Sequence, residues 1–373
     1  MTDISKFTGE LLQSMDHFMP ETALIVTFLV ALAVDLIRKE GRHLSGYVAL
    51  AGFVITGLLL FQQAGIEEIT FSGLLVIDQF SLFIRMIVLI TAILVLLFSF
   101  QSRELHEQYT KLGEYYILII GMVFGMFLLA GASNLIFIYL AIETMSISSY
   151  ILSGYTKFAK RASEASMKYV IYGAVSSGIM VYGISIIFGL TGSLNLSAIN
   201  AMMQQNQVET IPMLLAGLMI LTGFGYKISA VPFHFWTPDV YEGAPITITA
   251  LLSVASKAAG FAVMLRFFRM GLSTGAGSWE LISSVDWHFV IAALAVLTMT
   301  LGNLVALWQN NMKRMLAYSS IAHAGYMLMA VAVLNDTGVA AILIYFFMYM
   351  IMNLGAFLVV QVVADKSGSE DIE

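Results

Sequence analysis

The sequence predicts an all-α fold, a polytopic bundle of transmembrane helices. Its mean hydropathy is +0.86, and 59% of its residues are hydrophobic while only 11% are charged. Soluble globular domains carry about 25% charged residues, so the composition excludes a water-soluble fold. Apolar runs of about 18 residues or more, long enough to span a bilayer, recur eleven times. Because only short connections separate them, we expect residues 1–373 to form a single transmembrane domain.

The eleven predicted spans follow one another closely along the chain. They cover residues 20–38, 45–64, 78–101, 114–131, 134–155, 163–190, 209–231, 246–268, 286–308, 313–334 and 337–364. The first run has neither a basic segment before it nor a small-residue cleavage site after it, and it carries Asp35 near its end. These features are typical of a retained helix rather than a signal peptide.

The seventh span is expected to be broken. Its apolar run continues to Trp236 but contains Pro232, which removes an intrahelical hydrogen bond and clashes with the preceding turn. Pro238, Asp239 and Glu242 follow shortly afterwards. In membranes, such breaks occur where the backbone is buried in protein or lines a hydrated cavity, and the ends of the half-helices become ion sites.

Lysine and arginine are distributed unevenly between the two sets of connections. The connections after odd-numbered spans, together with the C-terminal segment, hold eleven of them: Arg38, Lys39, Arg42, Arg103, Lys111, Lys157, Lys160, Arg161, Lys313, Arg314 and Lys366. The N-terminal segment and the other connections hold three, which are Lys6, Arg266 and Arg269. Cytoplasmic loops carry the excess of positive charge, so we expect the N-terminus outside and the end after the eleventh span in the cytoplasm.

Several ionisable side chains fall inside the apolar runs, where a charge at the centre of a span costs roughly 2.5 to 3.5 kcal/mol. Glu143 and Lys257 lie near the middle of their spans, which favours function over structural pairing. Lys168 lies less than two turns from a helix end, so its side chain can extend to water at the membrane surface. This accounts for the charge as well as a functional role does. Asp78 and Arg85, near the start of the third span, favour an interhelical salt bridge or a headgroup contact.

Lys227 and His234 flank the predicted break at Pro232, which indicates a proton path. Burial and a nearby carboxylate act in opposite directions on how firmly a lysine holds its proton. A change at Glu143 would therefore switch Lys227 between holding and releasing a proton. His234 fits equally a neutral histidine bonded to a freed carbonyl, and His323 in the tenth span fits a helix-to-helix hydrogen bond as well as a proton relay.

The composition also limits the chemistry of the chain. It has no cysteine, so it holds neither a disulfide nor a thiolate-bound iron-sulfur cluster. It has no dinucleotide fingerprint, phosphate-binding loop or HExxH metal motif, and we expect neither a cofactor nor a metal on this chain. Its net charge is −6 and it has no basic tail, so no nucleic-acid partner is indicated. Protonatable groups without such motifs favour ion movement over bond making.

Three stretches of the sequence resemble a known family. The stretch GYKISAVPFHFWTPDVYEGAP over residues 225–245, followed by SKAA from Ser256, resembles the central signature of the antiporter-like membrane subunits of respiratory complex I. The stretches YLAIETMS from Tyr139 and KRMLAYSSIAH from Lys313 agree with it. The wording PDVYEGAP is similar to the branch called subunit N in bacterial NADH-quinone oxidoreductase, the counterpart of mitochondrial NADH dehydrogenase subunit 2.

The resemblance implies a fold of fourteen helices that contains two inverted five-helix repeats, the first over residues 114–268 and an incomplete second over 286–364. It implies a proton relay along a hydrated axis, with Lys168 modulating it and with Glu143, Lys227, His234 and Lys257 as carriers. NADH, FMN, iron-sulfur clusters and quinone would bind to other subunits. The partners would be the other membrane subunits of complex I, neighbouring antiporter-like subunits among them, and membrane lipid, in a bacterial inner membrane.

The sequence departs from the family pattern at its end. It stops after the eleventh span, whereas the family has a twelfth helix with a second break and its own lysine. We expect either a C-terminally truncated fragment or a last relay group supplied in another way. The expected function is that of a non-redox, proton-translocating subunit of NADH-quinone oxidoreductase, a translocase. Two alternatives stay open, which are a membrane subunit of a multisubunit cation/proton antiporter and a purely structural subunit that bridges its neighbours.

Overall fold

The computed structural model describes residues 2–38, 43–157, 159–205, 209–274, 279–281 and 285–372; Lys39 and Arg42 lie outside this part. Within it, eleven helical segments are long and apolar enough to cross a membrane, which confirms the predicted bundle. They are α2 (Met19–Ile37), α3 (Leu44–Gln62), α4 (Gln79–Ser99), α6 (Gly113–Gly131), α7 (Leu135–Ser153), α8 (Lys160–Thr191), α10 (Thr210–Ile228), the continuous stretch Ile246–Gly271, α14 (Trp287–Ala306), α15 (Met312–Val333) and α16 (Asp336–Ser367).

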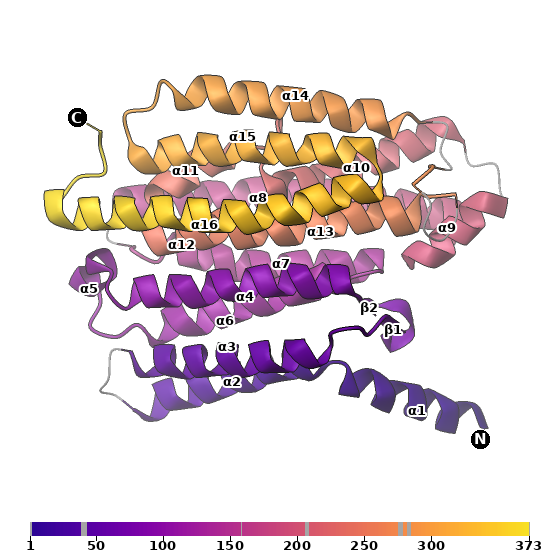
Figure 1. The fold of residues 1–373 in the computed structure, drawn as a ribbon, viewed down its shortest axis with the longest axis horizontal. Coiled ribbons are helices and arrows are strands. Elements are labelled where there is room, and N and C mark those ends of the chain that lie inside the picture. The colour runs from indigo at the N-terminus through magenta and orange to yellow at the C-terminus, as the bar shows by residue number, and fades with distance from the viewer. Residues whose placement is uncertain are drawn as a thin grey trace.

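The long helices lie side by side, and short helices and strands lie at the two ends of the bundle (Figure 1). One end, the hairpin end, carries an antiparallel hairpin that pairs Ile69 with Val76. Its elements are α1 (Thr2–Asp16), β1 (Glu68–Thr70), η1 (Phe71–Gly73), β2 (Leu75–Ile77) and α9 (Leu196–Gln205). The other end, the α5 end, carries α5 (Arg103–Gln108) and the C-terminal end of α16. None of these short elements was expected from the apolar runs.

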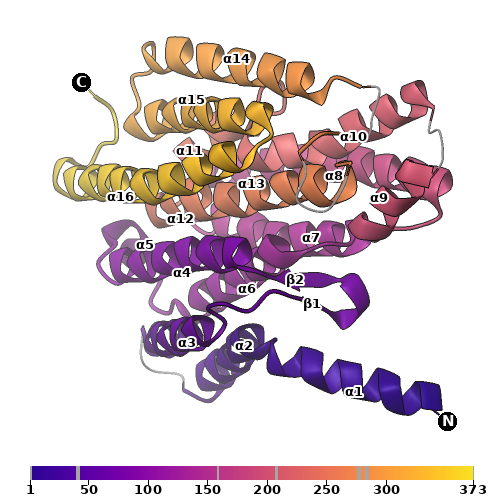
Figure 2. The same cartoon turned by 45° about the vertical axis from the view of Figure 1, so that its right-hand side comes forward.

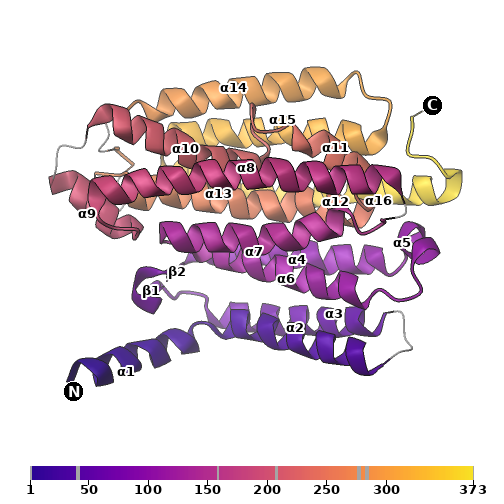
Figure 3. The ribbon, with the colours of Figure 1, turned by 180° about the vertical axis from the view of Figure 1, so that it is seen from behind.

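The chain crosses the bundle from one edge to the other. Helices α2 and α3 form one edge, α4, α6 and α7 follow, and α14 and α15 form the far edge, as two views that differ by 45° both show (Figures 1 and 2). Seen from behind, the long helix α8 crosses beside α10 (Figure 3). Helix α1 projects away from the bundle at the hairpin end in all three views.

The eighth span is the centre of the bundle. It consists of α12 (Ile246–Leu251), the π-helical turn η2 (Leu252–Ser256), α13 (Lys257–Arg266) and a second π-helical turn η3 (Phe267–Gly271). Every residue of α12, η2 and α13 is buried. Gly260 allows α13 to approach α10 closely, because a Cβ atom there would lie only 2.9 Å from a side-chain carbon of Ile228. A span enclosed on all sides keeps its polar groups away from lipid.

Polar caps fix where several spans begin. Asp78 accepts a hydrogen bond from the backbone N–H of Ser81 at the start of α4. Asn134, Asn311 and Asn335 accept backbone N–H groups in the same way at the starts of α7, α15 and α16. Such side chains satisfy donors that have no partner in the first turn of a helix. The predicted boundaries fall within a few residues of these observed starts.

Candidate proton path

Lys227 lies in the last turn of α10 with its side chain turned into the bundle. The residue is 2% exposed, and its Nζ donates to the Ser146 hydroxyl of α7 at 2.5 Å. The rings of Tyr150, Tyr169 and Tyr226 surround this amine, with centroids between 5.2 and 5.9 Å away. One hydroxyl and three aromatic faces therefore form the immediate surroundings of Lys227.

The helix that carries Lys227 is interrupted directly after it. Helix α10 ends at Ile228, and Ser229 follows in the left-handed conformation with φ of 63°. A turn leads from there to α11 (Trp236–Gly243). The N–H of Val231 in this turn donates to the Thr298 hydroxyl of α14 at 3.0 Å, so a neighbouring helix satisfies a backbone group that the break leaves free.

Glu143 lies on α7 and is half-buried. The Ser177 hydroxyl of α8 donates to its carboxylate. Ser146, the hydrogen-bond partner of Lys227, follows Glu143 by three residues and lies on the same side of α7. The expected pairing of Glu143 with Lys227 is thus indirect, since a serine makes the direct contact with the lysine.

Lys257 is the most enclosed of the candidate residues. It is 0% exposed and begins α13, immediately after the π-helical turn η2. Its Nζ donates to the backbone carbonyl of Ser320 on α15 at 2.8 Å. The Ser320 hydroxyl in turn accepts a hydrogen bond from the Tyr349 hydroxyl at 2.9 Å. Single π-helical turns inside α-helices are frequent at functional sites, which agrees with the position of Lys257.

His323 lies one turn beyond Ser320 on α15 and is half-buried. Its Nδ1 is 2.5 Å from the Tyr345 hydroxyl of α16, and its ring lies 5.0 Å from that of Tyr349. These contacts fit both interpretations of His323, because it joins two helices and also lies next to the groups around Lys257.

His234 lies in the turn between α10 and α11, where the sequence predicted the break. Its side chain is buried, with 4% of the residue exposed.

Lys168 has a different environment from the other lysines. Its Nζ forms ion pairs with Asp239 of α11 at 2.6 Å and with Glu164 of its own helix at 2.8 Å. Arg314 of α15 also binds Asp239, at 2.6 Å, and extends the cluster to Glu242 at 3.0 Å. The ion pairs therefore connect Lys168 to the second half of the broken helix rather than to Glu143 or Lys227.

The two charges expected to be structural both form interhelical salt bridges. Asp78 binds Arg266 of α13, with its two oxygens 3.0 and 3.1 Å from the guanidinium. Arg85 pairs with Glu21 of α2 at 3.0 Å, and both side chains are 1% exposed. Glu21 was not singled out in the sequence, because it lies at the start of the first span, where a carboxylate normally reaches water. Arg85 itself was the available signal, since a buried charge requires a partner.

Six buried or half-buried groups on α7, α10, α13 and α15 form a set that we call the polar axis: Glu143, Ser146, Lys227, Lys257, Ser320 and His323. Helices α10 and α13 pack closely beside Lys227, because a Cβ atom on Gly260, one turn after Lys257, would lie 3.4 Å from the Lys227 Cβ. In the described part of the chain, no group of three or more His, Asp or Glu side chains is arranged to hold a metal ion. The axis offers hydroxyl, amine, imidazole and carboxylate groups, all of which exchange protons.

The chain is similar to known membrane proteins over most of its length. A family model described as NADH:quinone oxidoreductase/Mrp antiporter, TM, matches residues 132–373. NADH-quinone oxidoreductase subunit N 2 of Chloroherpeton thalassium is 47% identical over 373 residues, a match that covers 99% of this chain and 73% of that protein. The chain belongs to the NADH:quinone oxidoreductase/Mrp antiporter family. This family member is accordingly a multi-pass membrane protein.

Two further matches refine the position within the NADH:quinone oxidoreductase/Mrp antiporter family. NADH-quinone oxidoreductase subunit N of Chlorobium chlorochromatii is 42% identical over 373 residues, covering 100% of this chain and 73% of that protein. A chain of respiratory complex I from Thermus thermophilus with bound Aureothin has a TM-score of 0.75 and 28% identity, covering 92% of this chain and 70% of that chain. The resemblance to complex I, and within the family to subunit N, is thereby confirmed.

Proposed function

We propose that this chain is the proton-translocating membrane subunit of an NADH-quinone oxidoreductase and that the polar axis carries the protons. The observation that supports this most strongly is how the two enclosed lysines are bonded. Among the described residues, Lys227 and Lys257 donate to a serine hydroxyl and a backbone carbonyl, and neither forms an ion pair. Buried charges that serve structure are normally paired, whereas an amine without a carboxylate partner is free to gain and lose a proton.

The contacts suggest how a proton moves along the axis. The Ser146 hydroxyl accepts from the Lys227 amine and lies one turn from Glu143, so it can pass a proton to or from Lys227 while the carboxylate sets the local field. On the other side, Lys257, Ser320 and Tyr349 form a connected set. His323 continues this set and, in its neutral form, can accept a proton at one nitrogen and release one at the other.

The same proposal assigns the other parts of the enzyme. NADH oxidation, FMN, iron-sulfur clusters and quinone reduction belong to other subunits, and the translocase activity belongs to the whole complex. The neighbours are other complex I membrane subunits and lipid of the bacterial inner membrane. The basic residues of the α5 end support a cytoplasmic position for this end under the positive-inside rule, with the N-terminus outside. Residues 114–268 would be the first five-helix repeat, and residues 286–364 an incomplete second one.

Replacing Lys257 tests the proposed function directly. Lys257→Met keeps the length of the side chain but removes the amine, and we expect NADH-driven proton pumping to fall severalfold while the complex still assembles. Proton uptake in inverted membrane vesicles, normalised to assembled complex on native gels, measures this. Lys111→Met is the matched control, because Lys111 pairs with Asp35 at the edge of the bundle, where the lysine side chain is 39% exposed. Normal pumping in the Lys257 variant would count against the relay.

The charge of Glu143 provides a second test. Glu143→Asp keeps a carboxylate and Glu143→Gln keeps only the size, so the Gln variant is expected to lose more quinone reductase activity if a negative charge tunes Lys227. Rates normalised to assembled enzyme decide between them. Equal rates in the two variants would contradict an electrostatic role and leave Glu143 as a hydrogen-bond partner of Ser177.

A further inference from the structure

Helix α16 presents three polar side chains to the surroundings of Lys257. It lies beside the eighth span (Figure 1). Tyr345, Tyr349 and Asn353 follow one another at intervals of four residues, so they lie on one face of the helix. The two tyrosines form hydrogen bonds with side chains of α15. Asn353 instead bonds η2, the π-helical turn directly before Lys257, so this face of α16 contacts both α15 and the turn that carries Lys257.

The contact between α16 and η2 is a hydrogen bond between two buried side chains, those of Asn353 and Ser253. The Asn353 amide donates to the Ser253 hydroxyl at 2.5 Å, and that hydroxyl donates to the Ala250 carbonyl at 2.8 Å. A buried polar group that loses its partner keeps the full cost of its desolvation. This bond therefore fixes α16 to η2 at one defined point.

The turn η2 has a geometry that needs stabilisation. A π-helical turn closes its hydrogen bonds over five residues instead of four, and such turns are rare in proteins. The hydroxyls of Ser253 and Ser256 donate to backbone carbonyls earlier in the same span. Serine hydroxyls bonded in this way slightly destabilise and often bend a regular α-helix. Asn353 adds a bond from a neighbouring helix, so local and tertiary contacts together hold the wide turn.

The direction of the Lys257 side chain depends on η2. Lys257 follows the turn directly, and its Nζ donates to the Ser320 carbonyl of α15 at 2.8 Å. Each residue of an α-helix advances the chain by about 100° around the axis, and a π-helical turn contains one residue more than a regular turn. Relaxation of η2 to α-helical geometry would therefore rotate Lys257 by about 100° relative to α12. The amine would then point away from Ser320.

We infer that Asn353 is a positioning residue of the proton relay, which holds η2 in its π-helical form and so keeps the Lys257 amine on the Ser320 carbonyl. The inference rests on the proposed function. The Asn353 amide carries no proton along the path, and it acts through Ser253 on the direction of Lys257. Control of the relay thus extends to α16, a helix that contributes no member to the polar axis.

Replacing the amide tests this role. Asn353→Leu keeps a side chain of similar shape but cannot bond Ser253, and we expect proton pumping to fall severalfold. Proton uptake in inverted vesicles, normalised to assembled complex on native gels, measures it. Pumping at the wild-type rate in the assembled Asn353→Leu complex would overturn the inference.

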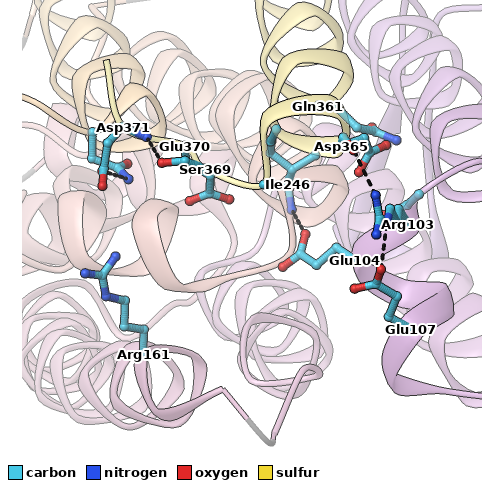
Figure 4. A pocket seen from close by; sticks show the side chains of 14 residues that line it. Arg103, Glu104, Glu107, Arg161, Ile246, Gln361, Asp365, Ser369, Glu370 and Asp371 are labelled. Atoms are coloured by element: carbon cyan, nitrogen blue, oxygen red, sulfur yellow. Dashed lines mark hydrogen bonds and ion pairs between the residues drawn. The ribbon is translucent and has the colours of Figure 1, made fainter. Parts of the chain in front are cut away.

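Gln361→Leu is the matched control on the same helix. Gln361 is also a buried amide of α16, but it donates to the Phe98 carbonyl of α4 at 3.2 Å. Figure 4 shows it among the residues that line a pocket at the α5 end of the bundle, eight residues along the chain from Asn353. Gln361→Leu is expected to pump as the wild type does. A loss equal to that of Asn353→Leu would assign the effect to any missing buried amide and overturn the inference.

A smaller change keeps the test valid if Asn353→Leu does not assemble. Ser253→Ala removes the hydroxyl that accepts the Asn353 amide and takes away a single oxygen atom. It is expected to lower pumping severalfold as well, because η2 loses the same contact with α16. Wild-type pumping in the assembled Ser253→Ala complex would contradict the positioning role.

A double variant distinguishes positioning from a general loss of packing. If Asn353 acts only through Lys257, the two substitutions are not additive, and Asn353→Leu combined with Lys257→Met is expected to pump at the rate of Lys257→Met alone. A further severalfold loss in the double variant would show that Asn353 acts independently of Lys257, which would overturn the inference.

The two proposals fail separately. If Lys257→Met lowers pumping but Asn353→Leu and Ser253→Ala pump normally, the relay stands and the positioning role is wrong. If Lys257→Met pumps normally, the relay through Lys257 is wrong, and the positioning role of Asn353 is wrong with it.

Discussion

Lys227→Met is expected to lower NADH-driven proton pumping by about tenfold or more, since positioned proton-transfer groups typically contribute 10²- to 10⁴-fold. The substitution removes the amine that donates to the Ser146 hydroxyl and lies over the rings of Tyr150 and Tyr226. We expect the methionine side chain to fit at position 227, because three tyrosine rings already enclose this position. Proton uptake in inverted vesicles and native gels of the assembled complex measure the two effects independently.

A milder variant gives the control for Lys227. Ser146→Ala leaves the amine in place and removes its hydroxyl partner, so a smaller loss is expected. Equal, complete losses in both variants, together with poor assembly, would indicate that the Lys227 contact holds α7 and α10 together. Unchanged pumping in Lys227→Met would remove this residue from the relay altogether.

Arg85→Met is expected to destabilise the subunit by about 3 to 5 kcal/mol, the usual cost of breaking a buried ion pair. The change leaves the Glu21 carboxylate enclosed without its cation, because both side chains are 1% exposed. Arg85 also donates to the Phe127 carbonyl and to the Gln63 amide oxygen, so several groups lose a partner at once. Thermal unfolding of the detergent-solubilised complex and the amount of subunit in the membrane report the effect.

Two variants identify the cause of that instability. Glu21→Gln combined with Arg85→Met removes both charges and is expected to restore most of the stability, because the main cost is an unpaired buried charge. Arg103→Met breaks an ion pair whose side chains are 65% and 61% exposed, and exposed pairs contribute only about 0 to 1 kcal/mol. A double variant as unstable as Arg85→Met alone would assign the loss to packing instead.

The spans were predictable because each depends on a local property. An apolar run of sufficient length becomes a helix in lipid, where every backbone group must be bonded within the segment. The interruption after Lys227 was also predictable, since Pro232 cannot continue a regular helix. The helix α1, the hairpin and α9 were missed because they lie outside the apolar runs, and short polar segments carry no comparable signal.

The site was predictable only as a set of residues. Burial of Lys227 and Lys257 follows from their depth in apolar runs. Their partners do not, because Ser146 is one hydroxyl among many in these helices and Ser320 contributes a backbone carbonyl. Such contacts depend on how α7, α10 and α15 rotate against one another.

The indole of Trp236 can serve as a fluorescent probe of the charge on Lys227. It is 1% exposed, stacks on Tyr169 with centroids 4.4 Å apart, and donates to the Tyr226 carbonyl at 3.0 Å. The Lys227 amine lies over those same two rings, so a change in its charge alters the electric field at the indole. Only three other tryptophans exist in the chain. With these replaced by phenylalanine, the emission of one fluorophore would follow Lys227 during turnover.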